Sequence, residues 1–217
     1  MKTLLTIVFL VLCVNASSTY SQGNSIAVAG VKFHSVVQVG GKTLTLNGVG
    51  VRTKSVFKVY AIGLYLAEPK KTTAEILSLA GAKRLTIVML RDVSTDDLRT
   101  SFMAAITANS TREERIRNVS SVLQFGEHFE TAPSLKKGDI IMLDWIPGSG
   151  LRCYLNDELV GDAISDAMFY QSVLKVWLGD RAVNSTLKAE LLKGPAGGTE
   201  ERKSVGPRGR KVSNQND

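Results

Sequence analysis

Three side chains that could bind an anion lie close together in one apolar stretch of the sequence. Arg52 ends the motif GVGVR, and Lys58 and Tyr60 lie in the following segment, FKVYAIGLYL. An arginine can hold an anionic group through two charge-assisted hydrogen bonds, and a tyrosine adds a directional hydroxyl. We therefore take Arg52, Lys58 and Tyr60 as candidate ligand-binding residues. If the protein is an enzyme, Arg52 is the candidate catalytic residue.

Whether these side chains meet depends on the backbone between them. If residues 52–66 form one unbroken strand, Arg52, Lys54, Lys58 and Tyr60 share a face that is polar at one end and apolar at the other. That face suits a ligand with an anionic head and an apolar body. In the alternative interpretation, a turn near Lys54 breaks the strand and leaves Arg52 and Lys54 in solvent.

The sequence carries none of the common catalytic signatures. It has no G-x-S-x-G, H-E-x-x-H, P-loop or C-x-x-C motif, and its two histidines and two cysteines do not suggest a zinc site. We expect no metal and no cofactor. His34 and His128 are interpreted as solvated or locally hydrogen-bonded residues, and the glycines of Gly48-Val49-Gly50 as a tight turn or a bulge.

The segments around the candidate residues predict an α+β protein with a largely antiparallel sheet covered by helices. Period-two and β-branched patterns predict strands, and apolar residues at helical spacing behind capping residues predict helices. The predicted strands cover residues 26–33, 34–52, 55–66, 84–93 and two segments within 136–161. The predicted helices cover residues 72–80, 95–106, 112–129, 162–178 and 185–192.

The two ends differ in composition from the rest of the chain. Residues 1–21 have the basic, apolar and small-polar parts of a secretory signal peptide, so we expect an exported protein, periplasmic or secreted, without a membrane segment in its mature form. Residues 22–193 form the expected folded domain. Residues 194–217 are rich in Gly, Pro and charge and are expected to be disordered. Removal of the signal peptide leaves Cys153 as the single cysteine, which excludes an intramolecular disulfide.

The formal net charge of +7 raises the question of a nucleic-acid partner. The basic residues occur singly or in pairs with acidic neighbours, a pattern typical of a solvated basic surface. We therefore expect no nucleic acid as a partner. The partner expected from the candidate residues is a small amphiphilic or phenolic ligand.

The motifs GVGVR, FKVYAIGLYL, KKGDIIMLDWIPGSG and VLKVWLG resemble those of the chalcone isomerase-like proteins, in particular an exported bacterial branch. The resemblance covers residues 25–192. It implies an open-faced β-sandwich, in which a large antiparallel sheet carries a layer of helices and a ligand cleft lies between them. It also implies that Arg52 is the counterpart of the plant arginine that steadies phenolate and enolate charge.

The resemblance places Tyr60 where the plant enzymes have a threonine, a change also found in fatty-acid-binding relatives of the fold. The other plant catalytic positions do not carry over to this sequence. The leading hypothesis is therefore a protein that binds a fatty acid or a similar amphiphile. The alternatives are an isomerase (an intramolecular lyase) that acts on a chalcone-like phenolic or enolisable substrate, and a non-catalytic structural or partner-binding module.

Overall fold

Seven strands pair into one antiparallel sheet, which is the framework of the candidate site. The computed structural model describes residues 24–131 and 134–194. The strand order across the sheet is β11-β10-β9-β6-β5-β4-β3. The strands are β3 Val36–Val39, β4 Lys42–Lys54, β5 Phe57–Leu66, β6 Lys83–Met89, β9 Ile140–Ile146, β10 Gly150–Leu155 and β11 Glu158–Ile164.

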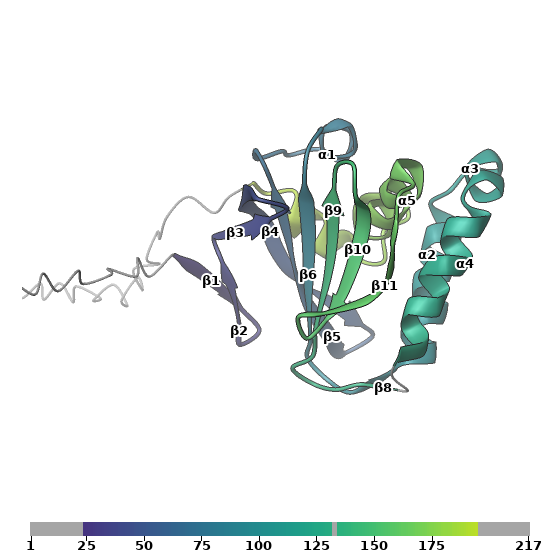
Figure 1. Ribbon diagram of the computed structural model, residues 1–217. Helices are drawn as coiled ribbons and strands as arrows, with labels where there is room; N and C mark the ends of the chain where they lie inside the picture. The colour runs from purple at the N-terminus through teal and green to yellow at the C-terminus, as the bar shows by residue number, and fades with distance from the viewer. Residues whose placement is uncertain (1–23, 132–133, 195–217) are drawn as a thin grey trace, which may run out of the picture.

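Helices cover one face of this sheet, with α2 and α4 side by side in the outer part of the layer (Figure 1). The largest apolar cluster lies between sheet and helices, and it joins Tyr60, Ile62 and Leu64 of β5 to Phe169, Val173 and Trp177 of α5. The helical segments are α1 Thr73–Ser78, α2 Thr95–Ala108, α3 Arg112–Arg117, α4 Val119–Glu127, the short 3₁₀ helix η1 His128–Thr131, α5 Ala167–Leu178 and α6 Ser185–Leu191.

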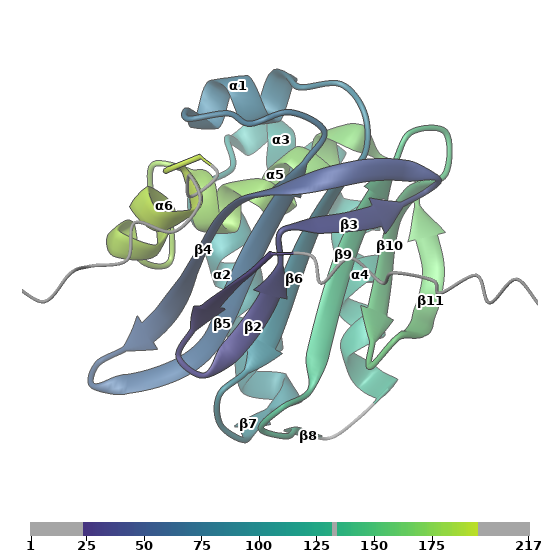
Figure 2. The ribbon, with the colours of Figure 1, turned by 90° about the vertical axis from the view of Figure 1, so that its left-hand side faces the viewer.

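The opposite face of the sheet is partly covered by a small hairpin made of β1 (Ser25–Val28) and β2 (Val31–His34), which lies in front of the sheet in Figure 2. Phe33 of this hairpin is buried in a second apolar cluster with Leu46, Ala61 and Tyr65 of the sheet. A third small ladder pairs β7 (Val93–Ser94) with β8 (Ser134–Leu135). The sheet with one helical layer confirms the predicted α+β class.

Local sequence signals explain most helix starts. Thr72 and Glu75 form a reciprocal capping box on α1, and the Ser94 side chain accepts a hydrogen bond from the backbone N–H of Asp97 at the start of α2. Several predicted elements are shorter than expected. The helix predicted over residues 162–178 begins at Ala167, because β11 continues to Ile164, and the strand predicted over residues 26–33 is divided into β1 and β2. The strand predicted over residues 84–93 ends at Met89, and the helix predicted over 112–129 is divided at Asn118, which caps the end of α3.

The glycines of the GVG motif lie inside β4 rather than in a tight turn. A bulge does occur next to them, because the register with β5 shifts between Leu46 and Gly48. A Cβ atom on Gly48 would lie 2.4 Å from the carbonyl oxygen of Glu190, so the glycine lets helix α6 pack directly on the strand. The glycine at position 48 is therefore required for the packing of α6 on β4.

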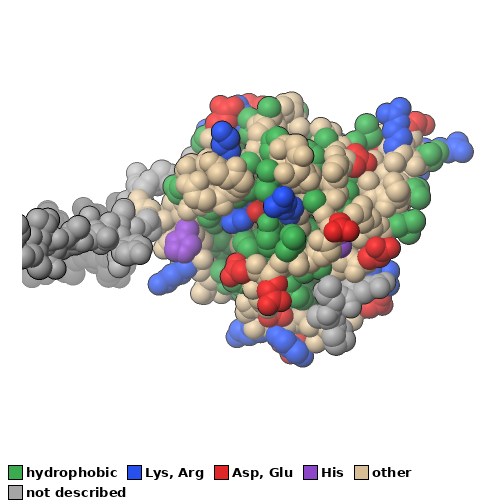
Figure 3. All heavy atoms as spheres, in the orientation of Figure 1, with side chains coloured by type: hydrophobic (Ala, Val, Ile, Leu, Met, Phe, Trp, Pro, Cys, Tyr) green, Lys and Arg blue, Asp and Glu red, His purple; other side chains and the backbone are tan. Residues whose placement is uncertain are grey.

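Basic and acidic side chains are interspersed over the face shown in Figure 3. Cys153 is a buried free cysteine. The predicted signal peptide and the predicted disordered tail from residue 195 onward lie outside the described residues.

Candidate functional site

Arg52 and Tyr60 are direct neighbours across the β4–β5 ladder. The chain turns between Lys54 and Phe57, so of the two interpretations of this stretch the unbroken strand over residues 52–66 is wrong and the turn near Lys54 is correct. The turn does not release Arg52 into solvent, however. Arg52 is paired with Tyr60 in the ladder, and its Cζ atom lies 5.6 Å from the centroid of the Tyr60 ring, within the range of a cation–π interaction.

A β-bulge explains why Lys58 does not join this pair. The ladder partners are Arg52 with Tyr60 and Thr53 with Lys58, so Val59 is an additional residue on β5. A bulge places the residues before it on the opposite face from the one that unbroken alternation predicts. Lys58 is consequently exposed and separated from Tyr60, and the predicted shared face for these two residues is wrong.

Tyr60 lies behind Arg52 in the protein interior. The indole Nε1–H of Trp177 donates a hydrogen bond to the Tyr60 hydroxyl oxygen at 2.8 Å, and both residues are almost fully buried. Burial raises the pKa of Tyr60 to about 12, although the positive charge of Arg52 opposes this shift. Tyr60 is therefore a neutral phenol at physiological pH, and its ring is a fixed support for the guanidinium.

A cavity of about 370 Å³ opens in front of Arg52, between the β4–β5 hairpin and the start of α2. We call it the Arg52 cavity. Its volume is at the lower end of the ~300–1,000 Å³ typical of small-molecule sites. Its walls are apolar at Phe57, Val59, Val93 and Leu98. Its polar lining residues are Arg52, Lys54, Ser55, Arg91, Asp92, Ser94, Asp97 and Ser101.

The charge of Arg52 is not matched by the acidic residues of this cavity. The Arg52 Nε atom is buried and has no hydrogen-bond partner among the described residues. Asp92 already accepts hydrogen bonds from the backbone N–H of Lys137 at 2.8 Å and from Lys136 Nζ at 3.4 Å. Asp97 lies in the first turn of α2, where the helix dipole stabilises a negative charge. The Nε atom is closed to solvent, but the Arg52 side chain lines the cavity and forms no ion pair with a described acidic residue, so its guanidinium is a favourable place for an anion.

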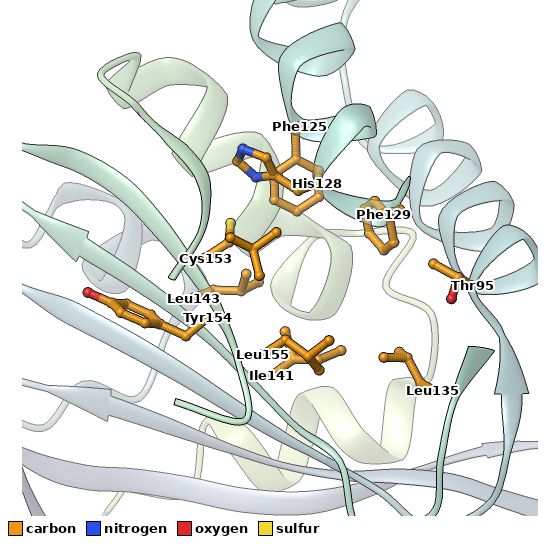
Figure 4. A pocket seen from close by; sticks show the side chains of 11 residues that line it. Thr95, Phe125, His128, Phe129, Leu135, Ile141, Leu143, Cys153, Tyr154 and Leu155 are labelled. Atoms are coloured by element: carbon orange, nitrogen blue, oxygen red, sulfur yellow. The ribbon is translucent and has the colours of Figure 1, made fainter. Parts of the chain in front are cut away.

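A second, smaller cavity of about 60 Å³ lies between η1, the end of α4 and strands β9 to β11. His128 and Cys153 lie at one end of it, and Thr95 with Leu135 lies at the other (Figure 4). Burial lowers the pKa of His128 and raises the pKa of the Cys153 thiol to about 12. A thiol with this pKa is almost entirely protonated at neutral pH and is not a nucleophile.

Several residues of the site had escaped sequence reasoning. Arg91 places its Cζ atom 4.9 Å from the centroid of Phe57, and together they form one wall of the Arg52 cavity. Trp177 reaches Tyr60 from 117 residues away. Arg91 was the one of these residues with a sequence signal, because it directly follows the apolar run that ends at Leu90. No sequence pattern indicated the contacts between distant segments, such as the one between Trp177 and Tyr60.

The described residues show no group of acidic, histidine or cysteine side chains suited to a metal ion. Within the same part of the chain, no helix has the length and apolar character that a membrane crossing requires.

Comparison with known proteins explains this arrangement of sheet, helices and cavity. The model of the chalcone isomerase-like family matches residues 25–193. The chain belongs to the chalcone isomerase-like family. Among solved structures, a fatty-acid binding protein of Arabidopsis thaliana aligns with a TM-score of 0.61 at 17% sequence identity, over 78% of this chain and 96% of that one. No curated protein sequence matches this chain significantly.

These matches confirm two predictions, the resemblance to the chalcone isomerase-like family and the open-faced β-sandwich of that fold. The large antiparallel sheet with its helical layer is the shared architecture. The identity to the Arabidopsis protein is low, so the match establishes the fold. The roles of Arg52, Tyr60 and Lys58 rest on the geometry described above.

Proposed function

We propose that this chalcone isomerase-like protein binds one small acid with an apolar body, such as a fatty acid, in the Arg52 cavity. The observation that carries the proposal is Arg52 itself, whose side chain lines a cavity with both apolar and polar walls and forms no ion pair with a described acidic residue. A carboxylate would accept hydrogen bonds from the guanidinium where it faces the cavity, and an alkyl chain would cover Phe57, Val59 and Leu98. The Arabidopsis protein of the same fold is a fatty-acid binding protein, which supports this ligand class.

Within this proposal the three predicted residues have different roles. Arg52 contacts the acid, because its side chain lines the cavity. Tyr60 is a positioning residue, because its hydroxyl is occupied by Trp177 and its ring lies against the guanidinium. Lys58 has no direct role, because the bulge removes it from the cavity.

A titration tests the proposal. Dodecanoic acid and dodecanol share an alkyl chain and differ in the charged head, so we expect the protein to prefer the acid by about 10- to 100-fold, the range of a hydrogen bond to a charged group. The Arg52→Ala variant should lose this preference. Arg99→Ala is the matched control, because Arg99 is an exposed arginine that pairs with Asp96 on α2.

The same variants distinguish the alternatives. Turnover of a chalcone by the wild type, lost in Arg52→Ala, would favour the isomerase. Absence of both binding and turnover would favour a structural or partner-binding module. Equal affinity for acid and alcohol would contradict the proposed role of Arg52.

We further propose that the protein is exported, on the basis of the signal-peptide pattern in residues 1–21. Amino-terminal sequencing of the mature protein should begin near residue 22. A mature protein that retains Met1 would contradict export by this route.

A further inference from the structure

The tip of the β4–β5 hairpin exposes two apolar side chains. Val56 is 84% exposed and Phe57 is 57% exposed. The hairpin extends beyond the rest of the sheet at the lower left of Figure 2. Adjacent exposed apolar residues on a projecting turn are a candidate surface for contact with another apolar phase.

Basic side chains surround this tip. Lys54 and Lys58 are exposed and flank it directly, and residues 54–58 contain no acidic residue. Arg91 covers the Phe57 ring, with its Cζ atom 4.9 Å from the ring centroid. Asp92, next in the chain, is hydrogen-bonded by Lys136 and Lys137. The tip therefore combines an apolar point with a positive rim.

We propose that the β4–β5 tip docks the protein onto an anionic lipid bilayer. Val56 and Phe57 would enter the interface between headgroups and acyl chains, and Lys54, Lys58 and Arg91 would contact the anionic headgroups. Apolar burial and attraction to anionic lipids together set the strength of such interfacial binding. The positive charge of the rim complements anionic lipid headgroups, and it therefore favours a bilayer over an uncharged, apolar protein surface as the partner of the tip.

The position of the tip gives the docking a purpose. Lys54, Phe57 and Arg91 line the Arg52 cavity as well as the tip, so a docked protein has its cavity opening at the bilayer surface. Amphiphilic acids partition into that region, with the carboxylate at headgroup level. This purpose rests on the proposed function, whereas docking itself requires only the tip.

Vesicle flotation tests the docking. The probes are vesicles of phosphatidylcholine alone and of equal parts phosphatidylcholine and phosphatidylglycerol. We expect the wild type to bind the anionic vesicles and to dissociate at high salt, because screening weakens the headgroup contacts. Val56→Ser should weaken binding about tenfold through loss of one buried apolar side chain. Lys58→Gln should weaken it roughly fivefold through loss of one charge at the surface.

Two matched controls exclude simple explanations. Leu123→Ser removes another exposed apolar residue, 66% exposed, from α4. Lys42→Gln removes an exposed lysine from the opposite end of β4. Both controls should bind the anionic vesicles as the wild type does. All four substitutions are at exposed sites, so melting temperatures should be unchanged and confirm folding.

Three outcomes would overturn the docking. The wild type could fail to bind either vesicle, or Lys42→Gln could weaken binding as much as Lys58→Gln does, which would show unspecific adsorption of a basic protein. Alternatively, sedimentation velocity could show a dimer that Val56→Ser abolishes, with no vesicle binding, which would assign the tip to a second copy. Failure of the proposed function is separate, because Val56 and Lys58 lie outside the cavity and dodecanoic acid binding is measured without vesicles.

Discussion

Replacement of Tyr60 by Phe tests whether Tyr60 positions Arg52 or contacts the ligand. The substitution removes the hydroxyl that accepts the Trp177 Nε1–H at 2.8 Å, and Trp177 is 1% exposed. A buried donor without an acceptor costs about 1–3 kcal/mol. The phenyl ring remains beneath Arg52 and preserves most of the cation–π contact.

We therefore expect Tyr60→Phe to lower the free energy of unfolding by about 2 kcal/mol, or the melting temperature by roughly 4–8 °C for a domain of this size. The affinity for dodecanoic acid should change little. Urea unfolding gives the first quantity and isothermal titration calorimetry the second. Tyr60→Ala is the comparison variant, because it removes the ring as well and should weaken binding.

The result that would refute this reasoning is specific. If Tyr60→Phe keeps wild-type stability, the Trp177 hydrogen bond is not a net stabilising contact. If Tyr60→Phe loses as much affinity as Arg52→Ala, the hydroxyl contacts the acid directly and Tyr60 is not a positioning residue.

Three further predictions concern the framework of the site. Gly48→Ala should destabilise the fold by about 1–3 kcal/mol, because its Cβ would overlap the backbone of α6. Gly126→Ala in α4 has room for the Cβ and should stabilise the fold by up to about 1 kcal/mol. Urea unfolding measures both free energies, and equal effects of the two substitutions would contradict the close packing at Gly48. A hydrogen bond from Lys175 lowers the pKa of Glu114, so the Glu114 carboxyl binds a proton more tightly in the unfolded state than in the folded state. The ionised carboxylate therefore stabilises the fold at neutral pH, and this stabilisation is lost as the pH falls below the ordinary glutamate range. Unfolding midpoints at neutral and acid pH should therefore fall less in Glu114→Gln than in the wild type, and an identical fall would refute the assignment. Cys153 should react with a thiol reagent only in denaturant, as peptide mapping would show, and rapid native labelling would contradict its burial.

The sequence predicted the fold well where the determinants are local. Capping residues such as Thr72 and Ser94 mark helix starts, and the turn residues 147–150 mark the β9–β10 hairpin. These signals depend on a few neighbouring side chains and therefore survive in any tertiary context. The family resemblance then implied the open-faced arrangement of one large antiparallel sheet and a layer of helices, which no local pattern contains.

The site was predicted only in part, for physical reasons. Arg52 and Tyr60 do lie together, but as partners across two strands and not along one unbroken strand, and the bulge at Val59 that excludes Lys58 depends on how β4 and β5 pair. The Trp177 contact and the cavity wall at Arg91 arise from packing between distant segments, which leaves no periodic trace in the sequence. The turn near Lys54 was an alternative interpretation of the sequence, but its predicted consequence for Arg52 is wrong, because Arg52 pairs with Tyr60 in the ladder and is not released into solvent.

Native mass spectrometry of the mature protein from its own host, combined with lipid extraction, tests the central claim most directly. Our account predicts one acidic amphiphile per chain in the wild type and in Arg99→Ala, and none in Arg52→Ala. An acid that remains bound in Arg52→Ala would show that the ligand lies elsewhere. A wild-type protein that is empty, and that also fails to take up added dodecanoic acid, would contradict the acid-binding function of the Arg52 cavity.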